Sequence, residues 1–132
     1  MNDRFKFRVW DKGNKRYQGT QDWQPYLDTD GDVCFINTDD VRNYPPENYF
    51  IIEQCTGLKD KNGNLIYEGD IIKDEFYRRF TIVWSEEDCL FEGRVIYRDP
   101  EYSDRFDLYK GATDNCEIIG NVHEQAEQKD NK

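Results

Sequence analysis

Apolar and polar residues alternate in short runs along this chain, and tight turns separate the runs. Residues 4–10 (RFKFRVW) place basic and apolar side chains in alternation. A period of two residues predicts a strand with one buried face there. Similar runs between turn residues predict further strands at 16–18, 25–27, 33–36, 49–55, 65–67, 71–73, 76–84, 89–97 and 116–123, with one more element starting at 106–109.

The segments between these runs carry Asp, Asn and Gly, which tolerate the left-handed backbone of hairpin turns. The strings 28–32 (DTDGD) and 60–64 (DKNGN) are two similar turns of this kind. Residues 37–48 include two consecutive prolines, which predicts a loop with one helical turn at most. The polar residues 124–132 predict a disordered tail.

Short strands with frequent turns and almost no helical period indicate a mainly β fold, a small barrel or roll with little helix. We expect an N-terminal β-hairpin region over 1–56 and a β-barrel or roll over 57–123, followed by the tail. One continuous domain over 4–123 is the alternative division. The 132 residues fit one compact domain or two small lobes that share a core.

Composition changes this picture in one respect. Only 36% of the residues are hydrophobic and the mean hydropathy is −1.03, values that by themselves lean toward disorder. However, 15% of the residues are Phe, Trp or Tyr, and each of these buries a large apolar area. We therefore expect a folded chain with a small aromatic core.

The net charge of −10 is unevenly spread. Residues 1–19 carry six bases and two acids, residues 20–48 one base and seven acids, and residues 85–107 three bases and eight acids. Overall acidity disfavours non-specific DNA binding. The basic first segment is the best nucleic-acid candidate, and otherwise it forms a solvated face or an electrostatic seam to the acidic segments. The candidate nucleic-acid residues are Arg4, Lys6, Arg8, Trp10, Lys12, Lys15 and Arg16.

Candidate chemistry is sparse. The string 28–32 places carboxylates at alternate positions, as a calcium loop does, but Val33 stands where that loop needs Gly and Asp39 where it needs Glu. The single histidine, His123, and four scattered cysteines offer no paired zinc ligands. No phosphate-binding glycine loop occurs. We predict no metal site, no cofactor and no catalytic residues, and reduced, partly buried thiols at Cys34, Cys55, Cys89 and Cys116.

No stretch approaches the roughly 20 consecutive apolar residues that span a bilayer. The first residues (MNDRF) lack the apolar core of a signal peptide. We therefore expect a cytoplasmic protein without membrane contact.

Three strings in this sequence resemble the YopX family of phage and prophage proteins. They are 5–11 (FKFRVWD), 54–72 (QCTGLKDKNGNLIYEGDII) and 117–122 (EIIGNV). The resemblance spans about residues 5–122, and Cys55 stands where the family pattern has an aromatic residue such as Tyr. It implies an SH3-type barrel that opens at the Glu68-Gly69-Asp70 turn, a mobile-element origin and a role inside a bacterial host. It implies no catalytic residues.

These observations favour a non-enzymatic accessory protein that acts through protein–protein contacts. We expect it to form a homo-oligomer and to bind a host or phage protein. Nucleic-acid binding through the basic first strand is the alternative, and acidic mimicry of DNA is a further one. The large aromatic residues expected to make protein contacts are Trp10, Trp23, Tyr26 and Trp84.

Overall fold

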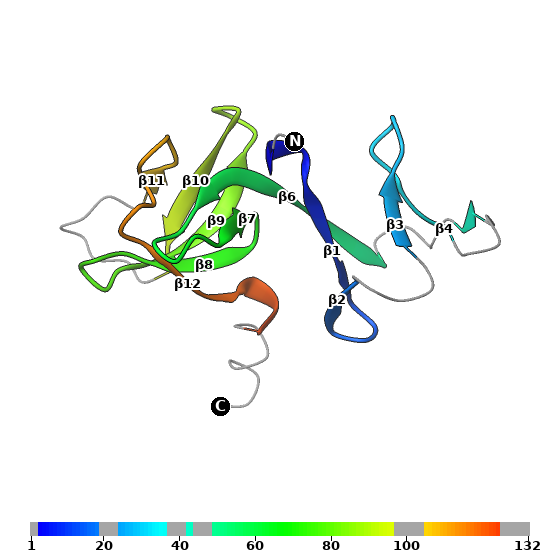
Figure 1. The fold of residues 1–132 in the computed structure, drawn as a ribbon, viewed down its shortest axis with the longest axis horizontal. Coiled ribbons are helices and arrows are strands. Elements are labelled where there is room, and N and C mark those ends of the chain that lie inside the picture. Colours follow the sequence, from blue (N-terminus) through cyan, green and yellow to red (C-terminus); the bar gives the residue numbers. More distant parts are fainter. Residues whose placement is uncertain (1–2, 19–23, 37–41, 44–48, 97–104, 125–132) are drawn as a thin grey trace. The chain divides into compact units, whose positions relative to one another are not determined.

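The computed structural model is mostly β and describes residues 3–18, 24–36, 42–43, 49–96 and 105–124, which confirms the predicted fold class (Figure 1). Its elements are a 3₁₀ helix η1 (Asp3–Phe5) and strands β1 (Phe7–Asp11), β2 (Arg16–Gln18), β3 (Gln24–Leu27), β4 (Val33–Ile36), β5 (Arg42–Asn43), β6 (Phe50–Lys59), β7 (Leu65–Tyr67), β8 (Asp70–Lys73), β9 (Arg79–Ser85), β10 (Leu90–Val95), β11 (Arg105–Asp107) and β12 (Glu117–Asn121).

The chain divides into two compact units. Unit 1 comprises Met1–Lys6 and Gln54–Lys132, and unit 2 comprises Phe7–Glu53. Strand β6 therefore begins in unit 2 and ends in unit 1. The division differs from the expected regions 1–56 and 57–123 mainly because the first six residues belong with the C-terminal part of the chain.

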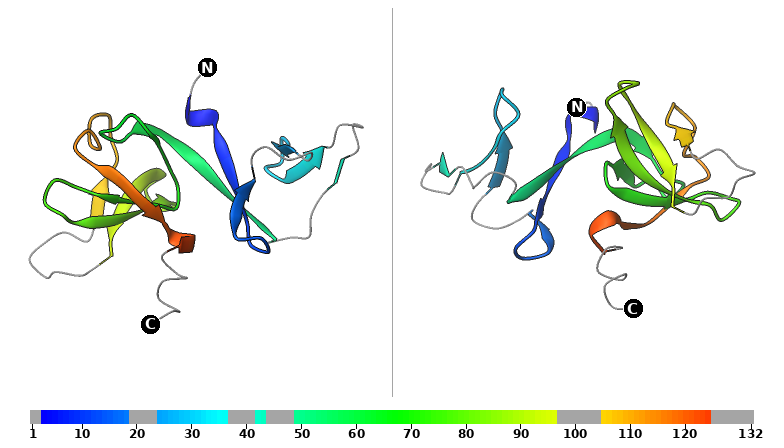
Figure 2. Two further views of the ribbon diagram at one scale, coloured as in Figure 1. Left: turned by 60° about the horizontal axis from the view of Figure 1, so that its bottom comes forward. Right: turned by 180° about the vertical axis from the view of Figure 1, so that it is seen from behind.

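Unit 1 is built on an antiparallel sheet in the order β11-β10-β9-β8-β12, which curls into a half-barrel (Figures 1 and 2). Ile72 lies opposite both Phe80 on β9 and Ile118 on β12. These side chains share one face of the sheet because directly opposed residues point the same way. The buried core on this face consists of Ile66, Ile72, Phe80, Ile82 and Cys116. The SH3-type detail stays a prediction.

The Glu68-Gly69-Asp70 turn ties this sheet together. The Asp70 carboxylate accepts a hydrogen bond from the Tyr67 amide at 2.8 Å, and Gly69 adopts a left-handed φ of 89°. The Gly69 amide donates to the Ile82 carbonyl, and its own carbonyl accepts from the Val122 amide, both at 2.8 Å. The predicted turn is thus confirmed, and it links three separate segments of unit 1.

Unit 2 contains the β1–β2 hairpin, the first part of β6 and a small sheet in the order β3-β4-β5. The predicted hairpin over 25–36 is confirmed, since Tyr26 lies opposite Cys34. The predicted loop at 37–48 lies mostly outside the described residues, which include there only the two-residue strand β5.

Two expected strands are wrong in part. The chain does not extend from residue 4, because the Lys6 amide donates to the Asp3 carbonyl at 3.0 Å and closes η1. The side chains of Val9, Trp10 and Asp11 are all buried, so the expected alternation also fails. Similarly, β9 begins at Arg79 instead of residue 76. The predicted tail at 124–132 falls outside the described residues except for Glu124, and no helix in the described ranges is long and apolar enough to cross a membrane.

Candidate functional site

Three turns in this chain share one backbone design. They are Asp28–Asp32, Asp60–Asn64 and Asp74–Arg78. In each turn the first Asp accepts hydrogen bonds at Oδ1 from the amides of the third and fifth residues, at 2.8 to 2.9 Å. The first Asp amide also donates to the fifth carbonyl, and the fourth amide donates to the first carbonyl, at 2.9 to 3.1 Å. The hairpin interpretation of the two Asp-rich strings is confirmed.

The fourth residue of this design adopts a left-handed backbone. Gly31 and Gly63 fill the position in two turns, with φ of 85° and 84°. Tyr77 fills it in the third turn, with φ of 66°. A left-handed conformation costs a residue with a Cβ atom about 1–2 kcal/mol. The other described non-glycine residues with positive φ, Lys15 and Cys89, lie in turns without this Asp design.

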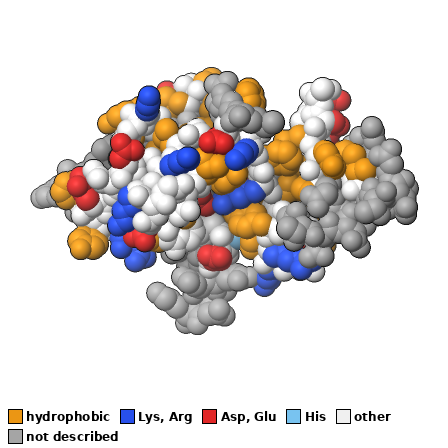
Figure 3. Space-filling model, in the orientation of Figure 1, with side chains coloured by type: hydrophobic (Ala, Val, Ile, Leu, Met, Phe, Trp, Pro, Cys, Tyr) orange, Lys and Arg blue, Asp and Glu red, His pale blue; other side chains and the backbone are white. Residues whose placement is uncertain are grey.

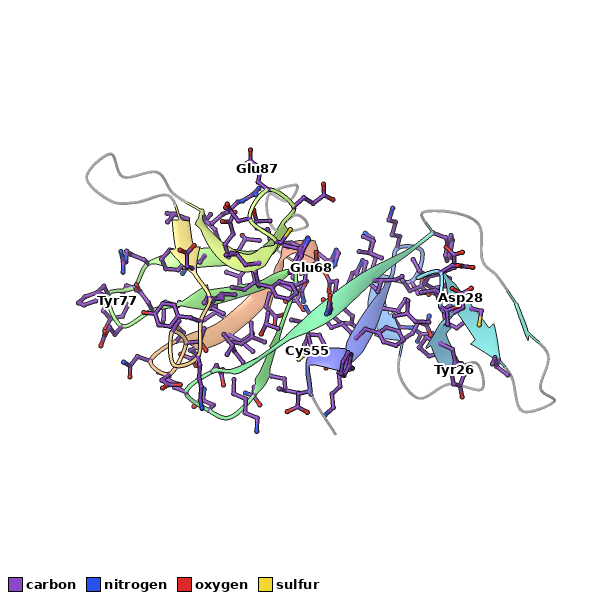
Figure 4. The ribbon with its side chains drawn as sticks, turned by 90° about the horizontal axis from the view of Figure 1, so that it is seen from above. Tyr26, Asp28, Cys55, Glu68, Tyr77 and Glu87 are labelled. Carbon is purple, nitrogen blue, oxygen red and sulfur yellow. The ribbon has the colours of Figure 1, made fainter. Side chains whose placement is uncertain are left out.

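The strained turn exposes two aromatic rings. Phe76 is 68% exposed and Tyr77 is 78% exposed, and Figure 4 shows Tyr77 pointing away from the sheet at the tip of its turn. The buried Asp74 carboxylate holds the turn, since its Oδ2 atom also accepts a hydrogen bond from Arg78 Nε at 2.7 Å. The rings are therefore presented on an ordered support.

Lys73 lies beside the Tyr77 ring, and Arg78 lies 5.6 Å from the centre of the Phe76 ring. Lys73 on β8 is directly opposite Arg79 on β9, and the Lys73 Nζ atom lies 5.4 Å from the centre of the Tyr77 ring. Like charges directly opposite one another destabilise a sheet. In Figure 3, Lys and Arg side chains gather over the part of unit 1 that carries β8 and β9. We name Lys73, Phe76, Tyr77 and Arg79 the aromatic–basic surface.

Two shallow hollows flank Lys73. One, of about 200 Å³, is lined by Ile71, Lys73, Arg79, Ile119, Gly120, Asn121 and Glu124. The other, of about 390 Å³, is lined by Lys61, Lys73, Asp74, Glu75, Tyr77, Asn115 and Glu117. Within the described ranges, no group of three or more His, Cys, Asp or Glu side chains is placed to hold a metal ion. This area therefore offers exposed aromatic rings and charged side chains for contact with another molecule.

Two of the predicted basic residues, Lys6 and Arg8, are engaged within their own units. Lys6 forms an ion pair with Asp3 at 3.1 Å, and a hydrogen bond from that pair raises the Lys6 pKa. Arg8 donates from Nε to the buried Glu53 carboxylate at 2.9 Å. The predicted residues Lys12, Lys15 and Arg16 are exposed in and after the β1–β2 turn, and the side chain of Arg4 lies outside the described residues. Nucleic-acid binding by this segment stays a prediction.

The predicted contact aromatics are placed unevenly. Trp10 is buried and packs edge-on against Tyr17, with ring centres 4.9 Å apart. Tyr26 is 48% exposed on β3 and Trp84 is 42% exposed on β9, whereas Trp23 lies outside the described residues. Phe76 and Tyr77 were not predicted as contact residues, because the composition of residues 76–84 predicts a strand. The sequence did contain one signal for this turn. Asp74 lies three residues before Tyr77, and the same distance separates Asp from Gly in the two glycine turns.

All four cysteines are free, as predicted; Cys34, Cys55 and Cys116 are buried, and Cys89 is exposed. Burial raises the pKa of the Cys116 thiol to about 11 and also raises that of Cys55. Both thiols are therefore poor nucleophiles at neutral pH.

The fold and this surface define a small, mostly β protein of two units. The model of the YopX protein family matches residues 6–128, so the chain belongs to the YopX family. The chain is similar to protein yopX from Bacillus subtilis, with 19% identity, a TM-score of 0.56, and 92% of this chain and 94% of that chain covered. It is also similar to protein EF1440 from Enterococcus faecalis, with 26% identity, a TM-score of 0.54, and coverage of 93% and 96%. No curated protein matches the chain.

Proposed function

We propose that this chain is a non-enzymatic accessory protein of phage or prophage origin that acts through protein–protein contacts. The aromatic–basic surface is its main contact. The observation that carries this proposal is the backbone conformation of Tyr77. Tyr77 occupies a left-handed position that the chain fills with Gly in two turns of the same design. Strained backbone conformations persist where function requires them.

The side chain of Tyr77 does not account for the strain through packing, because it is 78% exposed. An ordered, exposed pair of aromatic rings, with Lys73 beside Tyr77 and Arg79 opposite Lys73 in the sheet, has the composition of an interface hot spot, where Tyr, Trp and Arg predominate. The hydrogen bonds of Asp74 fix the turn before any partner arrives. A preordered turn loses little conformational entropy on binding.

The experiment is an affinity pull-down of tagged protein from bacterial host lysate, with and without nuclease, read by mass spectrometry. The wild type, Tyr77→Gly and Tyr109→Ser are compared. Tyr109 is 68% exposed and lies elsewhere in unit 1, so its variant controls for the removal of an exposed ring. We expect a nuclease-resistant protein that is retained by wild type and Tyr109→Ser and lost by Tyr77→Gly.

Two results contradict the proposal. Equal capture by all three proteins would show that Tyr77 makes no contact. Material that disappears on nuclease treatment would favour nucleic-acid binding instead, and the variant with Arg4, Lys6 and Arg8 changed to Glu would then show whether the first segment is responsible.

A further inference from the structure

Strand β9 joins two turns of opposite character. The turn before it carries the aromatic–basic surface. The turn after it, residues 85–89, carries Glu86 and Glu87, both exposed. Trp84, the next-to-last residue of β9, is 42% exposed. We name Trp84, Glu86 and Glu87 the acidic surface. Each surface thus combines exposed aromatic area with two charges of one sign, and the exposed Glu75 lies in the same turn as Phe76 and Tyr77.

The charges of both surfaces lack ion-pair partners among the described residues of unit 1. In that part of the chain Lys73, Arg79, Glu86 and Glu87 form no ion pair, whereas nearby Arg78 and Lys61 pair with Asp74 and Glu117. The two glutamates lie next to each other in one turn, and the two cations lie opposite each other on neighbouring strands. Two charges of the opposite sign, placed beside either pair, would offset the repulsion within that pair.

The two surfaces of one molecule cannot meet each other. They lie at opposite ends of the seven-residue strand β9, which spans about 20 Å at the usual rise of a strand. Figure 4 shows Tyr77 and Glu87 well apart in unit 1. A second molecule of the same chain, in contrast, supplies the complementary surface in every copy.

We propose that the aromatic–basic surface binds the acidic surface of a second copy of this chain. Lys73 and Arg79 then meet the carboxylates of Glu86 and Glu87, and the rings of Phe76 and Tyr77 pack against Trp84. Since the net charge of −10 repels two copies, a local match of opposite charges is what selects this contact. The contact joins different surfaces, so it forms a reciprocal pair, a ring or an open filament. This inference rests on the proposed contact function and names its partner.

The first experiment is charge reversal followed by sedimentation velocity over a wide range of protein concentration. Lys73→Glu with Arg79→Glu, and separately Glu86→Lys with Glu87→Lys, are each expected to weaken association about 100-fold or more, because like charges then face each other. The chain with all four changes regains association, and so does an equimolar mixture of the two double variants. Lys59→Glu with Lys110→Glu alters the net charge as much as the first double variant does, at other exposed positions of unit 1, and leaves association unchanged.

The second experiment uses Cys89, which lies in the acidic turn and is exposed while the other three thiols are buried. A benzophenone maleimide attached to Cys89 is photoactivated, and the cross-linked peptides are identified by mass spectrometry. Mixing isotope-labelled with unlabelled protein separates links between copies from links within one copy. We expect links between copies that map to residues 73–79.

Three results overturn the inference: a wild type that stays monomeric at every concentration, no recovery when all four charges are reversed, or cross-links that map elsewhere. Circular dichroism of each variant confirms folding. A monomeric wild type leaves the proposed function intact if Tyr77→Gly still loses a nuclease-resistant partner. If the wild type self-associates and the pull-downs of wild type and Tyr77→Gly capture the same proteins, the aromatic–basic surface serves only for contact between copies of this chain.

Discussion

The turns Asp60–Asn64 and Asp74–Arg78 have the same hydrogen-bond pattern but different roles in the fold. Asp60 is also bonded outside its turn, because its Oδ2 atom accepts from the Ile118 amide at 3.1 Å. The neighbouring Lys61 amide donates to the Cys116 carbonyl at 2.8 Å. The first turn therefore fastens β12 to the rest of unit 1, whereas the Asp74 carboxylate accepts hydrogen bonds from residues of its own turn.

The fourth position reflects the same difference. Gly63 meets the conformational demand of the turn, and no atom lies within 4 Å of the position that a Cβ atom would take there. Tyr77 meets the same demand with strain and an exposed ring. One turn is thus optimised for stability, and the other presents a side chain.

Removal of the two capping carboxylates should give the largest effects. Asp60→Ala leaves three amides without their acceptor, two in the turn and one on β12, and we expect a loss of about 4 kcal/mol in the free energy of unfolding. Asp74→Ala leaves only the two turn amides and the part-exposed Arg78 guanidinium without their acceptor, with no tie to another strand, and should cost about 2 kcal/mol. Urea denaturation followed by circular dichroism measures both. Equal losses would show that the tie to β12 contributes nothing.

Acid should weaken the Asp60 turn selectively. Burial raises the Asp60 pKa, but the hydrogen bonds from Ile118, Asn64 and Asn62 outweigh this and lower it below the ordinary value. A lowered folded-state pKa gives stability that is present above the unfolded pKa of about 3.9 and lost as the pH falls through the folded value. We expect Asp60→Asn to cost about 2 kcal/mol at pH 7. In urea titrations its deficit should shrink below about pH 4, and a constant deficit would contradict this assignment.

Local pattern was enough to predict the turns and most strands, because Asp, Asn and Gly at fixed offsets determine hairpin geometry without distant contacts. It failed where a distant or side-chain contact decides the structure. The 3₁₀ turn at Asp3–Phe5 replaces an alternating strand, and the buried Glu53 engages Arg8, which alternation alone places on an open face.

The aromatic–basic surface was not predicted from the sequence, for a related reason. The run from Phe76 to Trp84 is rich in aromatic and β-branched residues, and that composition favours a strand. Asp74 overrides the propensity by capping the amides of Phe76 and Arg78. Because Tyr stands where the other two turns have Gly, the string does not look like a turn, and backbone geometry was needed to reveal it.

Exchange of the fourth residue should give smaller effects of opposite sign. Gly63→Ala places a Cβ atom on a left-handed backbone with nothing within 4 Å, so we expect a conformational cost alone, about 1 kcal/mol. Tyr77→Gly relieves that strain and should stabilise the chain by up to about 1 kcal/mol, although it removes the contact ring. Thermal unfolding with both variants checks this. A destabilising Tyr77→Gly would show that the ring stabilises the fold and would remove the argument for its function.

The smallest expected effects separate two neighbouring cations. Arg78 is bound to the buried Asp74 carboxylate at 2.7 Å, so Arg78→Gln should destabilise the turn by about 1 kcal/mol. Lys73 faces Arg79 across the strands and has the Tyr77 ring as a neighbour. In Lys73→Gln the lost attraction to the ring and the relieved repulsion are each about 0.5 kcal/mol and nearly cancel. Urea denaturation should therefore distinguish Arg78→Gln but not Lys73→Gln from wild type, whereas sedimentation velocity should show weaker association for Lys73→Gln. A Lys73→Gln variant that loses stability and keeps its association would place Lys73 with Arg78 as part of the turn's own support.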